Sequence, residues 1–294
     1  EEVFYSYLEE WERKNPQYLT DTEQALVTFR NKSESGISQK IGSGSSLKPQ
    51  KRRALKLFLV ASLTLFGLLF LGTFDKVTVK TYNTGYGEMI TITLYDGTIV
   101  HLNANSELKT PRFALFSNSR KVELLGEASF NVTHDPINKF IVHTMNGLDV
   151  IVHGTEFTVY NRRHNTEVQL KSGKVELIKH NANGDESVLM KPGEKVRMEI
   201  DGVLQKEKVK APEDIASWTQ YRYVFDQTSL IEIARIISDN YGVEVEISGD
   251  SIGKRTLSGS FRSEDAKEFA EAVAQVLGIS LVIEKKRFRF AKMD

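Results

Sequence analysis

The sequence predicts a single-pass membrane protein with a short helical segment before the span and a large outer part. This outer part is predicted as an all-β domain followed by a small α+β domain. Three observations predict this organisation. Residues 54–74 form one long apolar run, residues 76–198 carry short apolar runs with a period of two, and helix and strand patterns alternate after residue 212. The predicted parts are residues 1–46, 54–74, 75–210 and 218–294.

Length and composition bound the possible functions. A chain of 294 residues is long enough for about two domains. Its 39 basic and 39 acidic residues give a formal net charge of zero, which argues against a protein built mainly to coat nucleic acid. The sequence contains no cysteine, which excludes a disulfide framework, a thiol nucleophile and a cysteine-ligated metal.

Residues 1–31 are predicted to form two short helices. The apolar residues of the first helix fall on one face at helical spacing: Phe4, Tyr7, Leu8 and Trp11. Two short helices bury little surface, so this face either packs against further helices of the same domain or forms a groove for another protein. The chain begins at Glu1 rather than at a methionine, so we expect this domain to be truncated at its N-terminus. Residues 32–50 are rich in Ser, Gly and Lys and are predicted to be a flexible tether.

The apolar run Ala54–Phe74 is predicted to be a transmembrane helix. Its one charge is Lys56, and the following 18 residues carry none. A signal peptide is shorter and lies at the extreme N-terminus, and a buried helix of a soluble domain is the remaining alternative. Residues 47–56 carry five bases and no acid, so the positive-inside rule places the N-terminus in the cytoplasm. In a bacterium, residues 75–294 would then lie in the periplasm and the span in the inner membrane.

Residues 76–198 are predicted to be all-β. Short β-branched runs are separated by glycines, and the Asp96-Gly97 step is a strong signal for a two-residue hairpin. No helical pattern of convincing length interrupts these runs. The pattern is typical of a sandwich, a roll or a β-helix-like stack.

Residues after 212 are predicted to form two βαβ-like units. Ser229 can cap a first helix that stops at Gly242, and a second helix is expected to begin in Ser263–Ala266 and to stop at Gly278. Residues 243–247, 256–261 and 279–283 are predicted strands. Apolar positions of the first unit recur in the second at an offset of 36 residues, which indicates a weak internal repeat.

The sequence carries no pattern of an enzyme or of a metal site. No two of the six histidines have a metal-ligand spacing, and we interpret them as solvated or hydrogen-bonded: His101, His134, His143, His153, His164 and His180. The acid pair Glu123 and Glu127 could suggest a glycosidase dyad, but surface carboxylates are common. Phosphate-binding and nucleophile motifs are absent. We therefore predict no enzyme, no catalytic residue, no metal and no cofactor.

The β-rich region resembles the FecR family of transmembrane anti-sigma regulators. The resemblance rests on five ordered blocks: TLYDGTIVHLNANSELKTP at Thr93–Pro111, KVELLGEASFNVTHD at Lys121–Asp135, FIVHT at Phe140–Thr144, IVHGTEFTVY at Ile151–Tyr160 and LMKPGEKV at Leu189–Val196. Within these blocks the residues are interpreted as fold determinants rather than catalysts. We expect Asn103 and Asn105 to satisfy backbone groups of a tight loop. Glycines 126 and 154 should permit backbone geometry closed to other residues, and phenylalanines 130 and 157 should anchor the core.

The C-terminal module resembles the short signalling domain found in secretins and at the N-terminus of TonB-dependent transducers. The two resemblances together imply a Bacteroidetes-type anti-sigma factor for cell-surface signalling. Its implied partners are an extracytoplasmic-function sigma factor inside, bound through Phe4, Tyr7, Leu8 and Trp11, and the signalling domain of a TonB-dependent outer-membrane receptor outside. Control by periplasmic and intramembrane proteases is implied as well.

Strand addition at a sheet edge is the expected mode of transducer binding, with an interface on a helix face as the alternative. The residues of the two candidate edge strands are Val243, Val245, Ile247, Leu257 and Phe261. Two other functions compete with signalling. A membrane-tethered protein that holds a glycan or the cell wall would need an aromatic-lined groove, and a membrane-anchored hydrolase would need convergent acids or a nucleophile with its base.

Overall fold

The structure is a computed structural model that describes residues 10–11, 13–14, 22–35, 62, 64, 79–112, 120–162, 165–181 and 184–293. The predicted membrane span lies outside these residues except for Ser62 and Thr64, and so do Phe4, Tyr7 and Leu8. No helix in the described part of the chain is long and apolar enough to cross a membrane. Near the N-terminus, α2 spans Thr22–Ser35. The predicted second helix is thus present, but it continues through residues 32–35, which are predicted to belong to the tether, because Lys32 and Glu34 are good helix formers.

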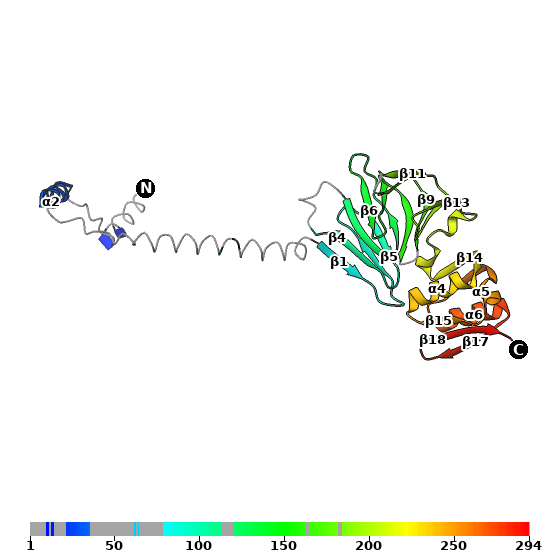
Figure 1. Ribbon diagram of the computed structural model, residues 1–294. Coiled ribbons are helices and arrows are strands. Elements are labelled where there is room, and N and C mark those ends of the chain that lie inside the picture. The colour runs from blue at the N-terminus through cyan, green and yellow to red at the C-terminus, as the bar shows by residue number, and fades with distance from the viewer. Residues whose placement is uncertain are drawn as a thin grey trace. The chain divides into compact units, whose positions relative to one another are not determined.

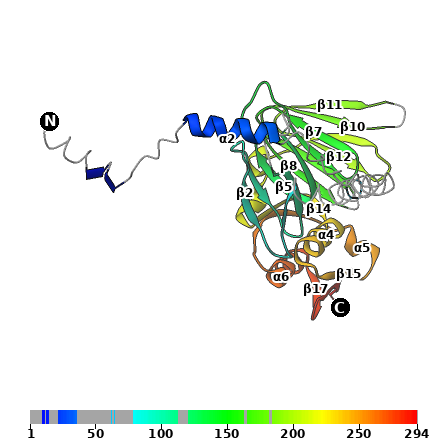
Figure 2. The same ribbon diagram turned by 90° about the vertical axis from the view of Figure 1, so that its left-hand side faces the viewer.

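Thirteen strands form the β-rich part of the described chain (Figures 1 and 2). Seven build one sheet, in the order β1-β4-β5-β6-β7-β10-β11, and seven build a second, in the order β2-β3-β5-β8-β9-β12-β13, because β5 belongs to both. Their bounds are β1 Val79–Asn83, β2 Ile90–Thr93, β3 Ile99–Leu102, β4 Glu107–Pro111, β5 Arg120–Asn131, β6 Phe140–Thr144, β7 Leu148–Val152, β8 Glu156–Arg162, β9 Asn165–Ser172, β10 Val175–Lys179, β11 Glu186–Met190, β12 Glu194–Glu199 and β13 Leu204–Lys208. The predicted all-β region is confirmed.

Strand β5 changes sheets at a glycine. Its first half pairs with β4 and, in parallel, with β6, and its second half pairs with β3 and β8. At the crossing point Gly126 has φ +104°, and a Cβ built there would lie 2.7 Å from the backbone Cα of Ser106. The Ser106 hydroxyl accepts a hydrogen bond from the Glu127 N–H at 3.0 Å. Glycine is therefore required at this position by its φ and by the close approach of the neighbouring loop.

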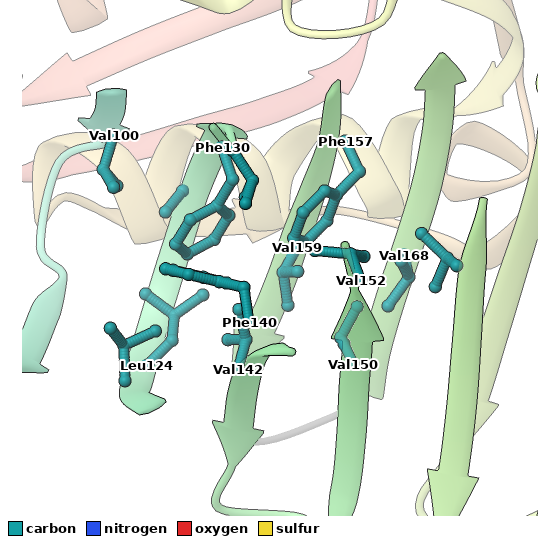
Figure 3. Packing of buried hydrophobic residues seen from close by; sticks show 14 of the residues in the cluster. Val100, Leu124, Phe130, Phe140, Val142, Val150, Val152, Phe157, Val159 and Val168 are labelled. Atoms are coloured by element: carbon teal, nitrogen blue, oxygen red, sulfur yellow. The ribbon is translucent and has the colours of Figure 1, made fainter. Parts of the chain in front are cut away.

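The two sheets face each other across one apolar core (Figure 3). Phe130 and Phe157 are fully buried and stack with ring centroids 5.1 Å apart, and Phe140 lies at a tilt 6.0 Å from Phe130. Valines of β6, β7, β8 and β9 fill the space beside these rings (Figure 3). The predicted anchors are thus confirmed, and the region is a sandwich-like pair of sheets.

The hairpin predicted at Asp96-Gly97 is present, but its loop has three residues, Tyr95–Gly97, rather than two, because the Leu94 N–H bonds to the Thr98 carbonyl at 2.9 Å. It joins β2 to β3, with Thr93 opposite Ile99 and Gly97 at φ +81°. The Asp96 carboxylate accepts hydrogen bonds from the Thr98 N–H at 3.0 Å and the Thr98 hydroxyl at 2.8 Å. Local side-chain bonds of this kind hold the turn closed.

The C-terminal module has two small sheets and three α-helices around a second apolar core. Strands β14 and β16 pair antiparallel; β15 pairs in parallel with β18, which pairs antiparallel with β17. The elements are η2 Pro212–Asp214, η3 Ser217–Gln220, β14 Arg222–Ser229, α4 Leu230–Tyr241, β15 Glu244–Ile247, α5 Asp250–Gly253, β16 Thr256–Arg262, α6 Ala266–Leu277, β17 Ile279–Glu284 and β18 Arg287–Lys292.

The structure corrects one detail of the predicted module. The two strands that flank each helix do not pair with each other, because β14 pairs with β16 and β15 pairs with β18, so neither unit is a true βαβ unit. The spacing of apolar residues along the chain indicates whether a segment is a helix or a strand. It does not indicate which strands pair, because that depends on how both helices pack on one shared core. The second helix begins at Ala266, as expected, and Asp265 caps it with a carboxylate that accepts from two backbone N–H groups. The predicted cap Ser229 and the stops at Gly242 and Gly278 are as expected.

Replacing Gly126 by alanine tests the sheet crossing. The added methyl group would collide with the Ser106 backbone, and the alanine would have to adopt a positive φ that its Cβ disfavours. We therefore expect the free energy of unfolding to fall by about 3 kcal/mol or more. Gly147→Ala is the matched control, because Gly147 has φ +79° but nothing within 4 Å of its ideal Cβ, and it should lose only about 1 kcal/mol. Equal losses in chemical denaturation would show that close approach is not what requires glycine at 126.

Candidate functional site

The C-terminal end of α4 docks on loops of the β-rich part. The last turn of a helix leaves carbonyl oxygens without intrahelical partners. Here the Asn240 carbonyl accepts from the Gly87 N–H at 2.8 Å, and the Asp239 carbonyl accepts from the Asn105 amide at 3.3 Å. Both donors come from the β-rich part, so the helix end is satisfied by the neighbouring domain.

Arg162, the last residue of β8, lies at the centre of this contact. Its guanidinium is 8% exposed and donates to the carbonyls of Ala104 at 2.9 Å and Asn105 at 3.1 Å. It also donates to the Asp239 carbonyl at 3.5 Å, and its Nε lies 3.9 Å from the Asp239 carboxylate. A cation at a helix C-terminus interacts favourably with the helix dipole. One arginine thus links two loop carbonyls to α4.

Two tyrosines complete the contact, which we call the α4 latch: Tyr86, Asn105, Tyr160, Arg162 and Asp239. The Tyr160 hydroxyl donates to the Asp239 carboxylate at 2.7 Å. Burial and the adjacent Asp239 charge raise the pKa of Tyr160, so this hydroxyl stays protonated. The ring of Tyr86 packs on the helix stop, where a Cβ on Gly242 would lie 2.7 Å from it.

The first turn of α4 makes a second contact with the β-rich part. The Arg197 guanidinium, from β12, donates to Glu167 of β9 at 2.7 Å and to Glu232 of α4 at 2.9 Å. The side chains of Arg197 and Glu232 are partly exposed, so this bridge contributes less than the latch. Both ends of α4 are nevertheless tied to the same domain.

A cleft of about 320 Å³ lies between these two contacts. Its walls come from both domains, with Tyr160 and Glu127 on one side and Trp218 and Arg235 on the other. The Glu127 carboxylate accepts from the Asn103 amide at 2.7 Å. Burial raises the pKa of Glu127 to about 7, against a smaller opposing effect of Arg162 and of that hydrogen bond. With this pKa, the Glu127 carboxyl group is partly protonated at neutral pH.

The structure places the predicted transducer-binding residues in two environments. Val243 and Leu257 are buried in the core of the module, so their side chains do not face a partner. Val245, Ile247 and Phe261 are half-buried. Within the described residues, β15 pairs with β18 alone and β16 pairs with β14 alone, so both predicted strands lie at a sheet edge and the main chain of each can accept an added strand.

Of the predicted sigma-binding residues, Trp11 alone is described, and it is 56% exposed. Leu26 and Phe29 of α2 are also exposed, at 67% and 75%. The histidines are mostly hydrogen-bonded: His143 and His180 both contact Asp149, at 2.7 and 3.1 Å. Within the described ranges, no three His, Cys, Asp or Glu side chains are grouped to hold a metal, and His164 lies outside those ranges.

Sequence reasoning assigned no role to Arg162, Tyr160 or Asp239. A basic residue at a strand end and an acid in the last turn of a helix are ordinary surface features. Their meeting across 77 residues of sequence depends on the tertiary fold. The sequence gives one hint of this contact, at Asn105. Its side chain is expected to bond to backbone groups of its own loop, but its amide donates to the carbonyl of Asp239 instead.

Both domains are similar to known protein families. The family model described as FecR protein matches residues 80–176, and the model described as FecR, C-terminal, matches residues 222–289. Two crystal structures of a chain from Parabacteroides distasonis ATCC 8503, provisionally described as an anti-sigma factor, match with a TM-score of 0.64 and 26% identity. They cover 74% and 73% of this chain and 100% of their own. No curated protein matches the sequence.

The raised pKa of Glu127 makes a testable prediction about stability. The folded state holds this proton more tightly than the unfolded chain, whose pKa is near 4.5. The stabilisation is complete below that pKa and is lost as the pH rises through about 7. Between pH 5 and pH 8 we therefore expect the wild type to lose about 1–3 kcal/mol of unfolding free energy relative to Glu127→Gln. Parallel pH dependences in urea titrations would contradict the assignment.

Proposed function

We propose a transmembrane signalling function for this chain, which belongs to the FecR family of anti-sigma factors. In the proposed topology, Ala54–Phe74 crosses the bacterial inner membrane once. The N-terminus lies in the cytoplasm, and residues 75–294 lie in the periplasm. The observation that carries this topology is the charge distribution, since residues 47–56 hold five bases and no acid directly before the apolar run.

Inside the cell, the proposed partner is an extracytoplasmic-function sigma factor bound by residues 1–46. The described part of this segment supports a protein-binding role because Leu26 and Phe29 expose large apolar side chains. Contiguous exposed apolar residues mark interaction surfaces. Phe4, Tyr7, Leu8 and Trp11 form the predicted centre of the sigma-binding face.

Outside the membrane, the proposed partner is the signalling domain of a TonB-dependent outer-membrane transducer. Strand addition to β15 is supported by the direction of its main-chain groups. The N–H groups of Glu244 and Ser248 bond to Lys286 and Phe290, so by alternation those of Val245 and Ile247 point to the open edge. An added strand would accept from these two donors.

A signal would pass inward by staged proteolysis that ends within the membrane. A single helix transmits shape change poorly, whereas its cleavage releases the cytoplasmic part completely. The predicted tether, which follows the end of α2 at Ser35, would leave the released segment free to remain with the sigma factor.

Co-purification from membranes, with tags at either end of the chain, tests the two-partner proposal. We expect a sigma factor to be captured only when residues 1–46 are present, and a TonB-dependent receptor to be captured through residues 75–294. Retention of polysaccharide with neither protein would instead favour a glycan- or cell-wall-binding function.

The sigma-binding face has a sharper test in the double variant Tyr7→Ala with Trp11→Ala. Truncation of two aromatic anchors should weaken sigma capture by about a hundredfold, since such anchors dominate protein interfaces. Tyr95→Ala is the control, because this tyrosine is exposed on the β2–β3 turn, outside the segment. Unchanged capture by the double variant would place the sigma-binding surface elsewhere.

A further inference from the structure

The cleft between the two domains has the size of a small-ligand site. Its volume of about 320 Å³ falls at the lower end of the range for ligand pockets in proteins. The β-rich part contributes Glu127, Tyr160 and Glu199, and the C-terminal module contributes Trp218 and Arg235. An occupant would touch both domains at once.

Several polar groups of this cleft have no partner among the described residues. The side chains of Asn165, Glu199 and Arg235 form no hydrogen bond or ion pair there, and neither does the indole N–H of Trp218. The buried unpartnered polar atoms of the described chain are the Nε atoms of Arg120 and Arg162, neither of which lines the cleft. The unpartnered cleft groups therefore face open space and are available to a ligand.

The lining of the cleft carries more acids than bases: three arginines, Arg197, Arg222 and Arg235, face five carboxyl groups, those of Glu127, Glu167, Glu199, Asp214 and Glu232. Two of its arginines are already paired, Arg197 with Glu167 and Glu232, and Arg222 with Asp214 at 2.6 Å. What remains is the Arg235 cation, the Glu199 carboxylate, and one oxygen of Glu127. Since burial holds the pKa of Glu127 near 7, its carboxyl group can donate as well as accept at neutral pH. This excess of carboxylate acceptors disfavours an anionic ligand and favours one that brings several hydroxyl donors.

Aromatic side chains add apolar faces to this polar lining. Trp218, Tyr160 and Tyr223 all line the cleft. Trp218 lies in the short helix η3, which is flanked by Ala216 at φ 67° and Tyr221 at φ 55°. A large ring with a polar tip can stack on an apolar surface and still donate a hydrogen bond.

We infer that this cleft binds a neutral saccharide of one or two rings. Hydroxyl groups of a sugar donate to carboxylates and accept from guanidinium and amide groups, and the C–H face of its ring packs on an aromatic side chain. The bound sugar would bridge β8 and β12 to α4 and η3, and so would stabilise the docked arrangement of the two domains. This inference does not depend on the proposed signalling partners.

Tryptophan fluorescence of the 294-residue chain tests the inference directly. The chain has two tryptophans, so a Trp11→Phe variant leaves Trp218 as the sole reporter. This protein would be titrated with glucose, galactose, mannose, N-acetylglucosamine, maltose and cellobiose. We expect a saturable change in Trp218 emission with at least one of these sugars. Arg235→Ala and Glu199→Ala, in the same background, should each weaken that binding about tenfold.

The matched control is Glu271→Ala, which lies on α6 at the repeat position that corresponds to Arg235 and outside the cleft. It should leave sugar binding unchanged. Three outcomes would overturn the inference: no saturable change with any of the six sugars, equal weakening by the control, or saturation by putrescine but by no sugar. Thermal unfolding of each variant distinguishes lost binding from lost folding.

Discussion

The arrangement of the β-rich domain and the C-terminal module depends on one buried cation at the end of a helix. Arg162 neutralises the C-terminal end of α4 and at the same time bonds to the carbonyls of Ala104 and Asn105. Because the guanidinium is nearly inaccessible to water, loss of its partners would leave a buried charge unpaired, which costs several kcal/mol. The latch therefore holds the FecR domain and the C-terminal module in one compact unit.

The same loop serves both the latch and the sheet crossing. Residues 103–106 supply the carbonyls that Arg162 binds and the Ser106 hydroxyl that receives the Glu127 N–H next to Gly126. Thr84 fixes this loop from the other side by donating to the Asn103 carbonyl at 2.6 Å. A structural change at the contact between the two domains would therefore also alter the point where β5 passes from one sheet to the other. The cleft with Glu127 lies beside this loop, so an occupant of the cleft would act on both features.

The sequence predicts local features well and contacts between distant residues poorly. Local features depend on only a few neighbouring residues, so the sequence pattern predicts them: the turn at Asp96-Gly97, the helix cap Ser229 and the helix end at Gly242. The parallel pairing of β15 with β18 and the meeting of Arg162 with Asp239 depend on how complete elements pack, and no period in the sequence carries that information. The FecR resemblance is confirmed by the family models, whereas the membrane span and three of the four sigma-binding residues lie outside the described chain.

Amide hydrogen exchange on an Arg162→Met variant tests the latch most directly. Methionine keeps much of the packing but removes the charge and its hydrogen bonds. The account predicts that exchange becomes about tenfold faster or more in residues 85–88 and 239–243, while the centre of β5 and β8 stays protected. Unchanged exchange at α4 would contradict the latch, and faster exchange throughout the FecR domain would mean that Arg162 stabilises that domain rather than its junction with the C-terminal module.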